Sequence, residues 1–317
     1  MVSQAVVNAF AVVGALLSLP LLLRFLGFIW LYFLRPTMIH RYVHGGYPYA
    51  VITGATDGIG RAVASELYTR GFNLILHGRN EKKMQKVVQE LLHLRDPSAQ
   101  GVVRYFIADA TKPGHDFEKM LEPFKDLNIT LVIHNVGGSN GVQPEKLDER
   151  PEEYIHNLVR WNALFPLLLT RVLLPQLRRS AKHGPVLVQF VGSLASDISP
   201  PRLPIYAASK RFLEALVRGL DNDEQNFGPP TGVRFTYLAV GPVHTASMPQ
   251  KPGLNTPTSE QFARAIVQRT GCGRRRVAPY AMHAVSTFVV GGLGERTVDY
   301  YTAQEMKTLI DVYAKGE

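Results

Sequence analysis

The stretch Thr53-Gly54-Ala55-Thr56-Asp57-Gly58-Ile59-Gly60 decides the fold of this chain of 317 residues. A short apolar run, residues 49–53, leads into it, and we predict a helix over residues 59–70 that stops at Gly71. A strand, a glycine-rich loop and a helix in this order form the context that a dinucleotide-binding motif requires. A plain glycine-rich turn is the alternative. We predict that the folded region opens with a dinucleotide-binding loop.

The three glycines of this loop have separate physical roles. Gly54 permits the tight turn, Gly58 lets the backbone approach a pyrophosphate, and Gly60 lets the helix pack closely on the strand. A pyrophosphate would meet the helix N-terminus, where free N–H groups and the helix dipole favour an anion. The predicted cofactor contacts in the loop are Gly54, Thr56, Asp57, Gly58, Ile59 and Gly60.

A second predicted strand, residues 72–77, ends in Gly78-Arg79-Asn80. Dinucleotide folds that prefer NAD usually have an acidic residue here, because it holds the ribose hydroxyls. Arg79 stands there instead, and a guanidinium suits a 2′-phosphate. We therefore predict NADP(H) as the cofactor. A solvated loop arginine is the alternative, and Asp57 is a small argument against, since a basic residue there would help a phosphate further.

Two further predicted strands end in polar residues. Residues 102–108 end at Asp109, and residues 129–134 end at Asn135-Val136-Gly137-Gly138. Both ends fall where an open parallel sheet exposes its ligand crevice, so Asp109 and Asn135 are candidate contacts of the adenosine. Taken alone, such residues are usually turn formers. The strands and helices together predict an α/β fold, a Rossmann-like doubly wound parallel sheet.

Tyr206 and Lys210, in Tyr-Ala-Ala-Ser-Lys, carry the strongest chemical signal. On a helix, this spacing puts both side chains on one face, one turn apart. An ammonium beside a phenol favours the phenolate, so we expect the pKa of Tyr206 to fall from ~10 towards working pH. The phenol would then give a proton to a carbonyl oxygen or take one from an alcohol. Such a pair alone is most often a chance surface pair, but Ser193 lies thirteen positions upstream, after a predicted strand over residues 186–191.

The N-terminal segment from Ala5 to Leu34 is almost wholly apolar, with Arg24 as its only charge. Residues 6–23 nearly supply the ~20 helical residues that cross a bilayer core. No basic region precedes the run and no small-residue cleavage site closes it, which disfavours a cleaved signal peptide; a buried core helix is the alternative. Arg35 and Arg41 follow the segment, so the bulk of the protein is predicted to lie in the cytosol.

The composition excludes several classes of site. Cys272 is the single cysteine, so neither an intrachain disulfide nor a cysteine-based zinc site can form, and no His/Cys/Asp cluster suggests another metal. The net charge is +9, but no basic block stands out beyond Arg274-Arg275-Arg276. We expect no nucleic-acid partner and attribute the excess charge to phosphate recognition and attraction to an anionic membrane.

The order and spacing of these motifs resemble the short-chain dehydrogenase/reductase superfamily. The resemblance covers roughly residues 47–248 and rests on residues 53–60, residues 135–138, Ser193, Tyr206 and Lys210. We divide the chain accordingly into a membrane anchor (1–35), a linker (36–46), a Rossmann domain (47–270) and a C-terminal strand/helix extension of that domain (271–317).

The resemblance implies a catalytic role for four residues. Tyr206 would be the general acid of a carbonyl reduction, and Ser193 would hold the substrate oxygen. Lys210 would lower the pKa of Tyr206 and bind the nicotinamide ribose. Asn162, in a helix predicted over residues 151–178, would anchor a water that relays protons to Lys210.

Residues 240–245 resemble the family's Pro-Gly segment beside the nicotinamide, although Val240 replaces the first proline. Val243 and Thr245 in this segment are candidate cofactor contacts. Residues 248–258, rich in Pro and Gly, are a candidate substrate lid. The apolar stretch 277–293 is interpreted as a final strand and a hydrophobic element near the membrane or at a subunit contact, with a second membrane span as the alternative. Homodimerisation is a family expectation.

Within the superfamily, the chain looks like the branch of very-long-chain 3-oxoacyl-CoA reductases and related 17β-hydroxysteroid dehydrogenases. The likeness rests on the membrane segment, the loop over residues 53–60 and Arg79. It implies a single-pass protein of the endoplasmic reticulum with a cytosolic catalytic domain, using NADPH in fatty-acid elongation or on a steroid. The chain departs from that branch at Gly241-Pro242-Val243, where those enzymes tend to have Pro-Tyr-Phe.

Three functions are therefore compared. The leading one is a membrane-anchored, NADPH-dependent reductase of a ketone on a lipid-like substrate, such as a 3-oxoacyl-CoA or a steroid. The departures after Tyr206 favour a ketoreductase of specialised metabolism, acting on a polyketide or terpenoid. A non-catalytic NADP(H)-binding scaffold is the third, and the presence of all four catalytic residues argues against it.

Overall fold

The computed structural model describes residues 3–96, 101–142 and 144–315, and it divides into two compact units, Met1–Thr37 and Met38–Glu317. The first unit is helix α1 (Gln4–Ile29), which continues into the π-helical turn η1 (Trp30–Leu34). This helix of 31 residues has a mean hydropathy of 2.3 and no buried residue in its most apolar window. At 1.5 Å per residue it is about 45 Å long, enough to cross a bilayer core of about 30 Å.

The second unit is built on a parallel sheet of seven strands in the order β3-β2-β1-β4-β5-β6-β7. This order reverses between β1 and β4, which places a ligand crevice outside the carboxyl ends of those strands. The strands are β1 (Pro48–Thr53), β2 (Asn73–Gly78), β3 (Val103–Ile107), β4 (Asn128–His134), β5 (Val186–Val191), β6 (Val233–Leu238) and β7 (Arg276–Val277). The predicted Rossmann-like fold is confirmed.

The central strands are buried along their whole length. Every residue of β1, β2 and β5 is buried, because helices cover both faces of a parallel sheet. Mostly apolar runs such as Val186–Val191, in which Gln189 is polar, therefore form strands without an alternating pattern.

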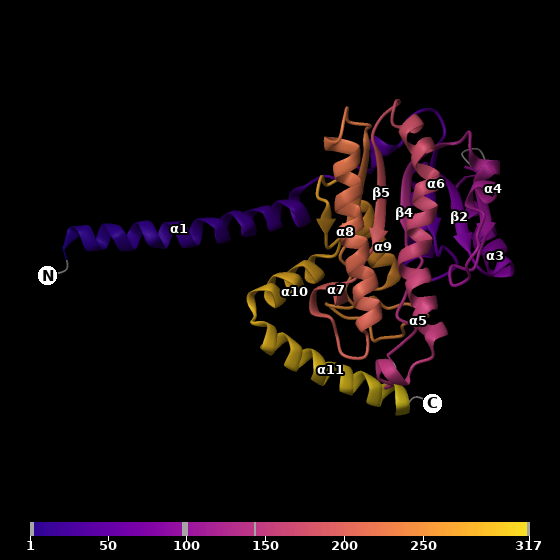
Figure 1. Cartoon of the computed structure of the whole chain (residues 1–317). Coiled ribbons are helices and arrows are strands. Elements are labelled where there is room, and N and C mark those ends of the chain that lie inside the picture. The colour runs from indigo at the N-terminus through magenta and orange to yellow at the C-terminus, as the bar shows by residue number, and fades with distance from the viewer. Residues whose placement is uncertain (1–2, 97–100, 143, 316–317) are drawn as a thin grey trace. The chain divides into compact units, whose positions relative to one another are not determined.

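Helices pack on both faces of this sheet. Helix α2 (Gly58–Thr69) contacts α3 (Glu81–Leu92) and α9 (Ser259–Arg269), and α8 (Pro204–Asn226) contacts β6 and α5 (Glu152–Val159). Figure 1 shows α6 (Phe165–Ser180) and α8 in front of β4 and β5. Further helical segments before β7 are η2 (Ile39–Tyr42), α4 (Phe117–Leu121), η4 (Glu122–Phe124), η5 (Leu147–Glu149), η6 (Arg160–Leu164) and α7 (Ala195–Ile198).

The helix predicted over residues 151–178 is interrupted. It consists of α5, a π-helical turn η6 (Arg160–Leu164) and α6, and Asn162 lies in the π turn. The span Glu152–Ser180 is long and apolar enough to cross a membrane, but 44% of its most apolar stretch is buried. Since α6 packs on β4, we interpret this span as a core helix of the sheet domain.

Two helices follow β7 at the C-terminal end. Helix α10 (Ala281–Gly292) is apolar and exposes Phe288 and Val289, but it is shorter than a membrane span. Helix α11 (Glu295–Lys315) follows it, and both are visible in yellow in Figure 1.

Part of the basic run 274–276 forms ion pairs within the protein. Arg275 Nε donates to Asp221 Oδ2 at 2.6 Å, and the Asp221 side chain is fully buried. Arg276 pairs with Asp197 and, at 3.1 Å, with Glu214. These two arginines hold β7 to its neighbours and leave little charge for a membrane or a phosphate.

Candidate active site

The glycine loop lies at the carboxyl end of β1, next to the point where the strand order reverses. Gly54 and Gly58 have φ angles of +66° and +53°, a conformation that glycine adopts most readily. Asp57 caps α2, with its Oδ1 accepting from the Gly58 N–H at 2.7 Å. The predicted contact residues of the loop therefore surround the N-terminus of a helix, where an anion is favoured.

The loop leaves no room for a side chain at Gly60. A Cβ built there would lie 2.2 Å from the Gly54 carbonyl oxygen and 2.6 Å from Asn135 Nδ2. Asn135 closes this contact from β4: its amide donates to the Gly54 carbonyl at 3.2 Å, and its backbone N–H donates to Thr53 Oγ1 at 2.9 Å. Asn135, predicted as an adenosine contact, thus holds the glycine loop against the end of β4.

Thr56 and Thr245 flank the loop. A Cβ on Gly58 would lie 3.1 Å from Thr245 Cγ2, so the segment after β6 packs directly on the glycine turn. A Cβ on Gly78, at the end of β2, would lie 2.7 Å from Thr56 Cγ2. Ile59 is partly exposed beside them, whereas Val243 is 4% exposed and packs inside.

Arg79 and Asp109 mark the ends of β2 and β3. Burial opposes ionisation of Asp109, but hydrogen bonds from Thr111 and then the charge of exposed Arg79 hold the Asp109 pKa below its usual range. The Thr111 hydroxyl donates to Asp109 Oδ1 at 2.8 Å. A cation and a carboxylate therefore lie close together at this edge of the crevice.

Ser193 follows β5 and is fixed by several hydrogen bonds. Its Oγ accepts from the Ala195 N–H at 3.1 Å, and its hydroxyl lies close enough to the phenol of Tyr206 to oppose the rise of the phenol pKa. Ser196, the other serine near Tyr206, is buried and donates to the Ser193 carbonyl at 2.7 Å. The structure therefore brings Ser193, and not Ser196, to the tyrosine, as the thirteen-residue spacing predicts.

Tyr206 and Lys210 share one face of α8, but the expected fall in the phenol pKa is wrong for this structure. Burial raises the pKa of Tyr206 above 10, and the hydrogen bond with Ser193 only partly opposes this. Lys210 is 3% exposed, and burial lowers its pKa to about 8. Its Nζ lies 5.8 Å from the Tyr206 ring centre and donates to the Val191 carbonyl at 2.9 Å. Burial therefore favours the protonated form of the Tyr206 phenol.

Asn162 meets Lys210 at Gly137. A Cβ on Gly137 would lie 2.7 Å from Asn162 Oδ1 and 3.0 Å from Lys210 Nζ. The Asn162 amide donates to the carbonyls of Gly138 and Leu158, at 2.9 and 3.1 Å, and its Oδ1 accepts from the Gly138 N–H at 2.9 Å. The side chain is thus committed to the backbone after β4.

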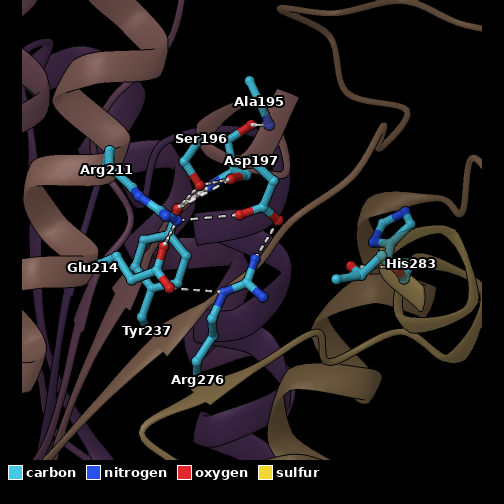
Figure 2. A network of polar contacts seen from close by, with 10 residues as sticks. Ala195, Ser196, Asp197, Arg211, Glu214, Tyr237, Arg276 and His283 are labelled. Carbon is cyan, nitrogen blue, oxygen red and sulfur yellow. Dashed lines mark hydrogen bonds and ion pairs between the residues drawn. The ribbon is translucent and has the colours of Figure 1, made fainter. Parts of the chain in front are cut away.

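Two buried residues that the sequence did not single out support the site. Tyr237 of β6 is hydrogen-bonded to the backbone of Ser193, and Figure 2 shows it beside Ser196 and the ion pairs of α7 and α8. His283 of α10 accepts from the Gly241 N–H at Nδ1, at 3.1 Å. Its Nε2 donates to the carbonyls of Pro242 and Asn255, at 3.1 and 3.2 Å.

These contacts of His283 join three segments. The ring connects α10 with the Gly241-Pro242 segment and with the predicted lid over residues 248–258. Burial lowers the pKa of His283, so the ring is neutral and its single proton lies on Nε2. The only sequence signal for this role was a histidine inside an apolar stretch.

Within residues 3–96, 101–142 and 144–315, no group of three or more His, Cys, Asp and Glu side chains is placed to hold a metal ion. The arrangement offers proton donors, backbone N–H groups and one buried ammonium.

The sequence matches the family described as short chain dehydrogenase over residues 48–252. It is 30% identical to the very-long-chain 3-oxoacyl-CoA reductase of Pyricularia oryzae, over 90% of this chain and 84% of that protein. It is 31% identical to the reductase of the same name from Neurospora crassa, over 86% of this chain and 79% of that protein. A very-long-chain 3-oxoacyl-CoA reductase-like protein of Arabidopsis thaliana is 30% identical, over 84% and 83% of the two chains.

Solved structures resemble the sheet domain. An alcohol dehydrogenase from the archaeon Thermococcus sibiricus, complexed with 5-hydroxy-NADP, matches 70% of this chain and 89% of its own, with a TM-score of 0.58 and 28% identity. A 7β-hydroxysteroid dehydrogenase matches 84% of this chain and 99% of its own, with a TM-score of 0.69 and 18% identity. At that identity, the second likeness supports the fold alone.

Proposed function

Because the chain belongs to the short-chain dehydrogenase family of oxidoreductases, we propose that it reduces the 3-keto group of a long-chain acyl-CoA with NADPH at a membrane. The observation that carries this proposal is the meeting of Ser193 and Tyr206 beside the glycine loop, at the carboxyl edge of the sheet. Relatives named as very-long-chain 3-oxoacyl-CoA reductases support the choice of substrate.

The geometry favours reduction over simple binding. NADPH, when bound, supplies the hydride that the carbonyl carbon accepts. Ser193 and Tyr206 then offer two hydroxyl donors to the carbonyl oxygen, and Tyr206 gives its proton to that oxygen as the alcohol forms. The raised pKa of Tyr206 keeps this proton in place at neutral pH.

Lys210 and Asn162 support the acid. Lys210 replaces the proton of Tyr206 after reduction and binds the nicotinamide ribose. The Asn162 side chain is fully engaged with Gly138 and Leu158, so we assign it the positioning of the backbone after β4 and of Lys210. The water relay remains a prediction of the family resemblance.

The residues present fit NADP(H). Gly54, Gly58 and Gly60 keep side chains out of the path of a pyrophosphate, and the α2 N-terminus favours its charge. Exposed Arg79 suits a 2′-phosphate, and Asp109 suits the adenine amino group.

The first unit supports membrane attachment. Helix α1 with η1 is long and apolar enough to span a bilayer once. We propose a single-pass anchor in the endoplasmic reticulum with the catalytic domain in the cytosol. Arg35 and Arg41 follow the span, and positive charges beside a span favour the cytosolic side.

The test is NADPH oxidation by the detergent-solubilised full chain with a long-chain 3-oxoacyl-CoA. We expect turnover, and Tyr206→Phe should lower kcat by about 10²–10⁴-fold because the proton donor is lost. NADPH binding without turnover of the acyl-CoA would reject this substrate. A panel of steroid, polyketide and terpenoid ketones would then identify the ketone that the site accepts. Tyr206→Phe protein that retains full turnover would reject the catalytic assignment.

A further inference from the structure

Tyr237 is a buried tyrosine that has no part in proton transfer, yet its hydroxyl is committed to the backbone of Ser193. The Ser193 N–H donates to the Tyr237 oxygen at 2.9 Å, and the Tyr237 hydroxyl donates to the Ser193 carbonyl at 3.1 Å. The Tyr237 phenol therefore holds both the N–H and the carbonyl of Ser193, the residue whose Oγ faces Tyr206. This inference rests on the proposed function.

The fit between Tyr237 and the end of β5 is steric as well as polar. Tyr237 pairs with Phe190 in the β5–β6 register, and its hydroxyl reaches Ser193, three residues after Phe190 and just beyond the end of β5. A Cβ on Gly192 would lie 2.0 Å from Tyr237 Cζ and 2.3 Å from its hydroxyl oxygen. The phenol thus occupies the space of a side chain at position 192, and glycine there admits it.

The Tyr237 hydroxyl keeps its proton under working conditions. Tyr237 is 0% exposed, and burial raises its pKa to about 12. The Ser196 hydroxyl donates to the same Ser193 carbonyl at 2.7 Å, and its oxygen lies 3.1 Å from the Tyr237 oxygen. The backbone polar groups of Ser193 are held by groups that water does not reach.

Ion pairs extend this support to the helix that carries Tyr206. Figure 2 shows Asp197 of α7 and Glu214 of α8 on either side of Arg276, next to Tyr237. Arg211 of α8 pairs with Glu214 at 2.9 Å and with Asp197 at 3.4 Å. These partly exposed pairs contribute little energy individually, but they join the segment after Ser193 to α8.

We propose that Tyr237 is a positioning residue for the reduction: its hydroxyl holds the Ser193 backbone so that the Ser193 and Tyr206 hydroxyls meet the same substrate oxygen. A shift of about 1 Å in a donor lowers a rate by as much as about 100-fold, so the loss of this support affects kcat strongly. The hydrogen bonds of Tyr237 go to Ser193 and not to the glycine loop that receives the pyrophosphate, so we expect NADPH affinity to be largely independent of Tyr237.

The chain offers a matched control in Tyr68. This tyrosine of α2 is also 0% exposed, donates to the Gly101 carbonyl at 3.1 Å and accepts from the Gly101 N–H at 3.1 Å. Tyr68→Phe and Tyr237→Phe therefore remove the same two hydrogen bonds from a buried site, and they differ in whether Ser193 is held.

The experiment compares kcat, KM, the NADPH dissociation constant and Tm of the full chain in detergent. Tyr237→Phe should lower kcat by about 10- to 100-fold, with NADPH affinity unchanged and a loss of Tm similar to that of Tyr68→Phe. Tyr68→Phe should keep the wild-type kcat. Equal kcat values in the two variants would overturn the proposal.

A double-mutant cycle separates positioning from general damage. In a Ser193→Ala background, Tyr237→Phe should cause no further fall in kcat, because the group that it positions is absent. A full additional fall would overturn the proposal. Should Tyr237→Phe not fold, Ser196→Ala replaces it in the same cycle, since Ser196 bridges Tyr237 and the Ser193 carbonyl.

Crystal structures of the wild type and Tyr237→Phe decide the proposal independently of any substrate. We expect the Ser193 hydroxyl to move away from the Tyr206 phenol in the variant, and an unmoved Ser193 would overturn the inference. Failure of the wild type to reduce any ketone would instead reject the proposed function, so the two failures are distinguishable.

Discussion

The two halves of the sheet position their functional groups in opposite ways. In the half from β3 to β4, the backbone forms the binding surface: glycines leave space, and the N-terminus of α2 supplies free N–H groups. In the half from β5 to β7, buried polar side chains hold the functional groups in place, and these side chains come from distant parts of the sequence. Tyr237 reaches Ser193 across 44 residues, and His283 reaches Gly241 across 42 residues. Substitutions that add atoms should therefore impair the first half, and substitutions that remove polar groups should impair the second half.

The largest expected effect tests the second half at Lys210. Lys210→Met should lower kcat by about 10²–10⁴-fold, because proton replacement at Tyr206 is lost. The same change should raise the free energy of unfolding by roughly 2 kcal/mol. The lowered pKa of Lys210 corresponds to a cost of ~3 kcal/mol for burying its charge, which the methionine removes. The gain is smaller because the Val191 carbonyl loses its hydrogen-bond donor. Exposed Lys182→Met, the control for thermal unfolding and kinetics, should change neither quantity.

The stability gain of Lys210→Met should depend on pH. The pKa of Lys210 is lowered from 10.5 to about 8 by folding, so the folded wild type buries a charge below pH 8. Between these two values the unfolded chain binds a proton that the folded chain does not, and wild-type stability rises with pH. The advantage of the variant should therefore shrink from pH 8 towards pH 10.5. A difference in Tm that is constant over this range would contradict the buried charge.

The next effect tests the first half by adding one methyl group. Gly60→Ala places a Cβ 2.2 Å from the Gly54 carbonyl oxygen, so the glycine loop must move. We expect NADPH affinity to fall by about 5- to 150-fold, from an overpacking cost of about 1–3 kcal/mol. Gly219→Ala is the control, since no atom lies within 4 Å of a Cβ there and alanine favours the helix. Equal NADPH dissociation constants for the two variants would refute this account of the loop.

The smallest effect concerns the choice of cofactor. Arg79→Ser should weaken NADPH by about tenfold, the value of one charged hydrogen bond of about 1.5 kcal/mol, and leave NADH affinity unchanged. Arg218→Ser, on the exposed face of α8, should alter neither. Equal weakening of NADPH and NADH by Arg79→Ser would show that Arg79 does not contact a 2′-phosphate.

The contrast between the halves also explains what the sequence could predict. The glycine loop, the strand ends at Asp109 and Asn135, and the Tyr206–Lys210 spacing are local signals, because each depends on residues a few positions apart. They were sufficient for the fold class and for the site where Ser193 and Tyr206 meet. The family roles assigned to the individual residues stay predictions.

The remaining features depend on contacts that no local pattern encodes. Tyr237 looks like one more aromatic residue in an apolar strand, and its role appears only once β6 lies beside β5. The pKa of Tyr206 was expected to fall because Lys210 is near in sequence, but burial raises it, and burial also lowers the pKa of Lys210. The partners of the basic run 274–276 are likewise distant in sequence, since Asp221, Asp197 and Glu214 meet Arg275 and Arg276 only in the folded chain.

The most direct test of the central claim follows the hydride itself. The full chain is incubated with a long-chain 3-oxoacyl-CoA and NADPH deuterated at both C4 positions, and the product is analysed by mass spectrometry and NMR. The account predicts a 3-hydroxyacyl-CoA that carries one deuterium at C3, and almost none with Tyr206→Phe protein. Unchanged 3-oxoacyl-CoA, or a 3-hydroxyacyl product without deuterium at C3, would contradict it.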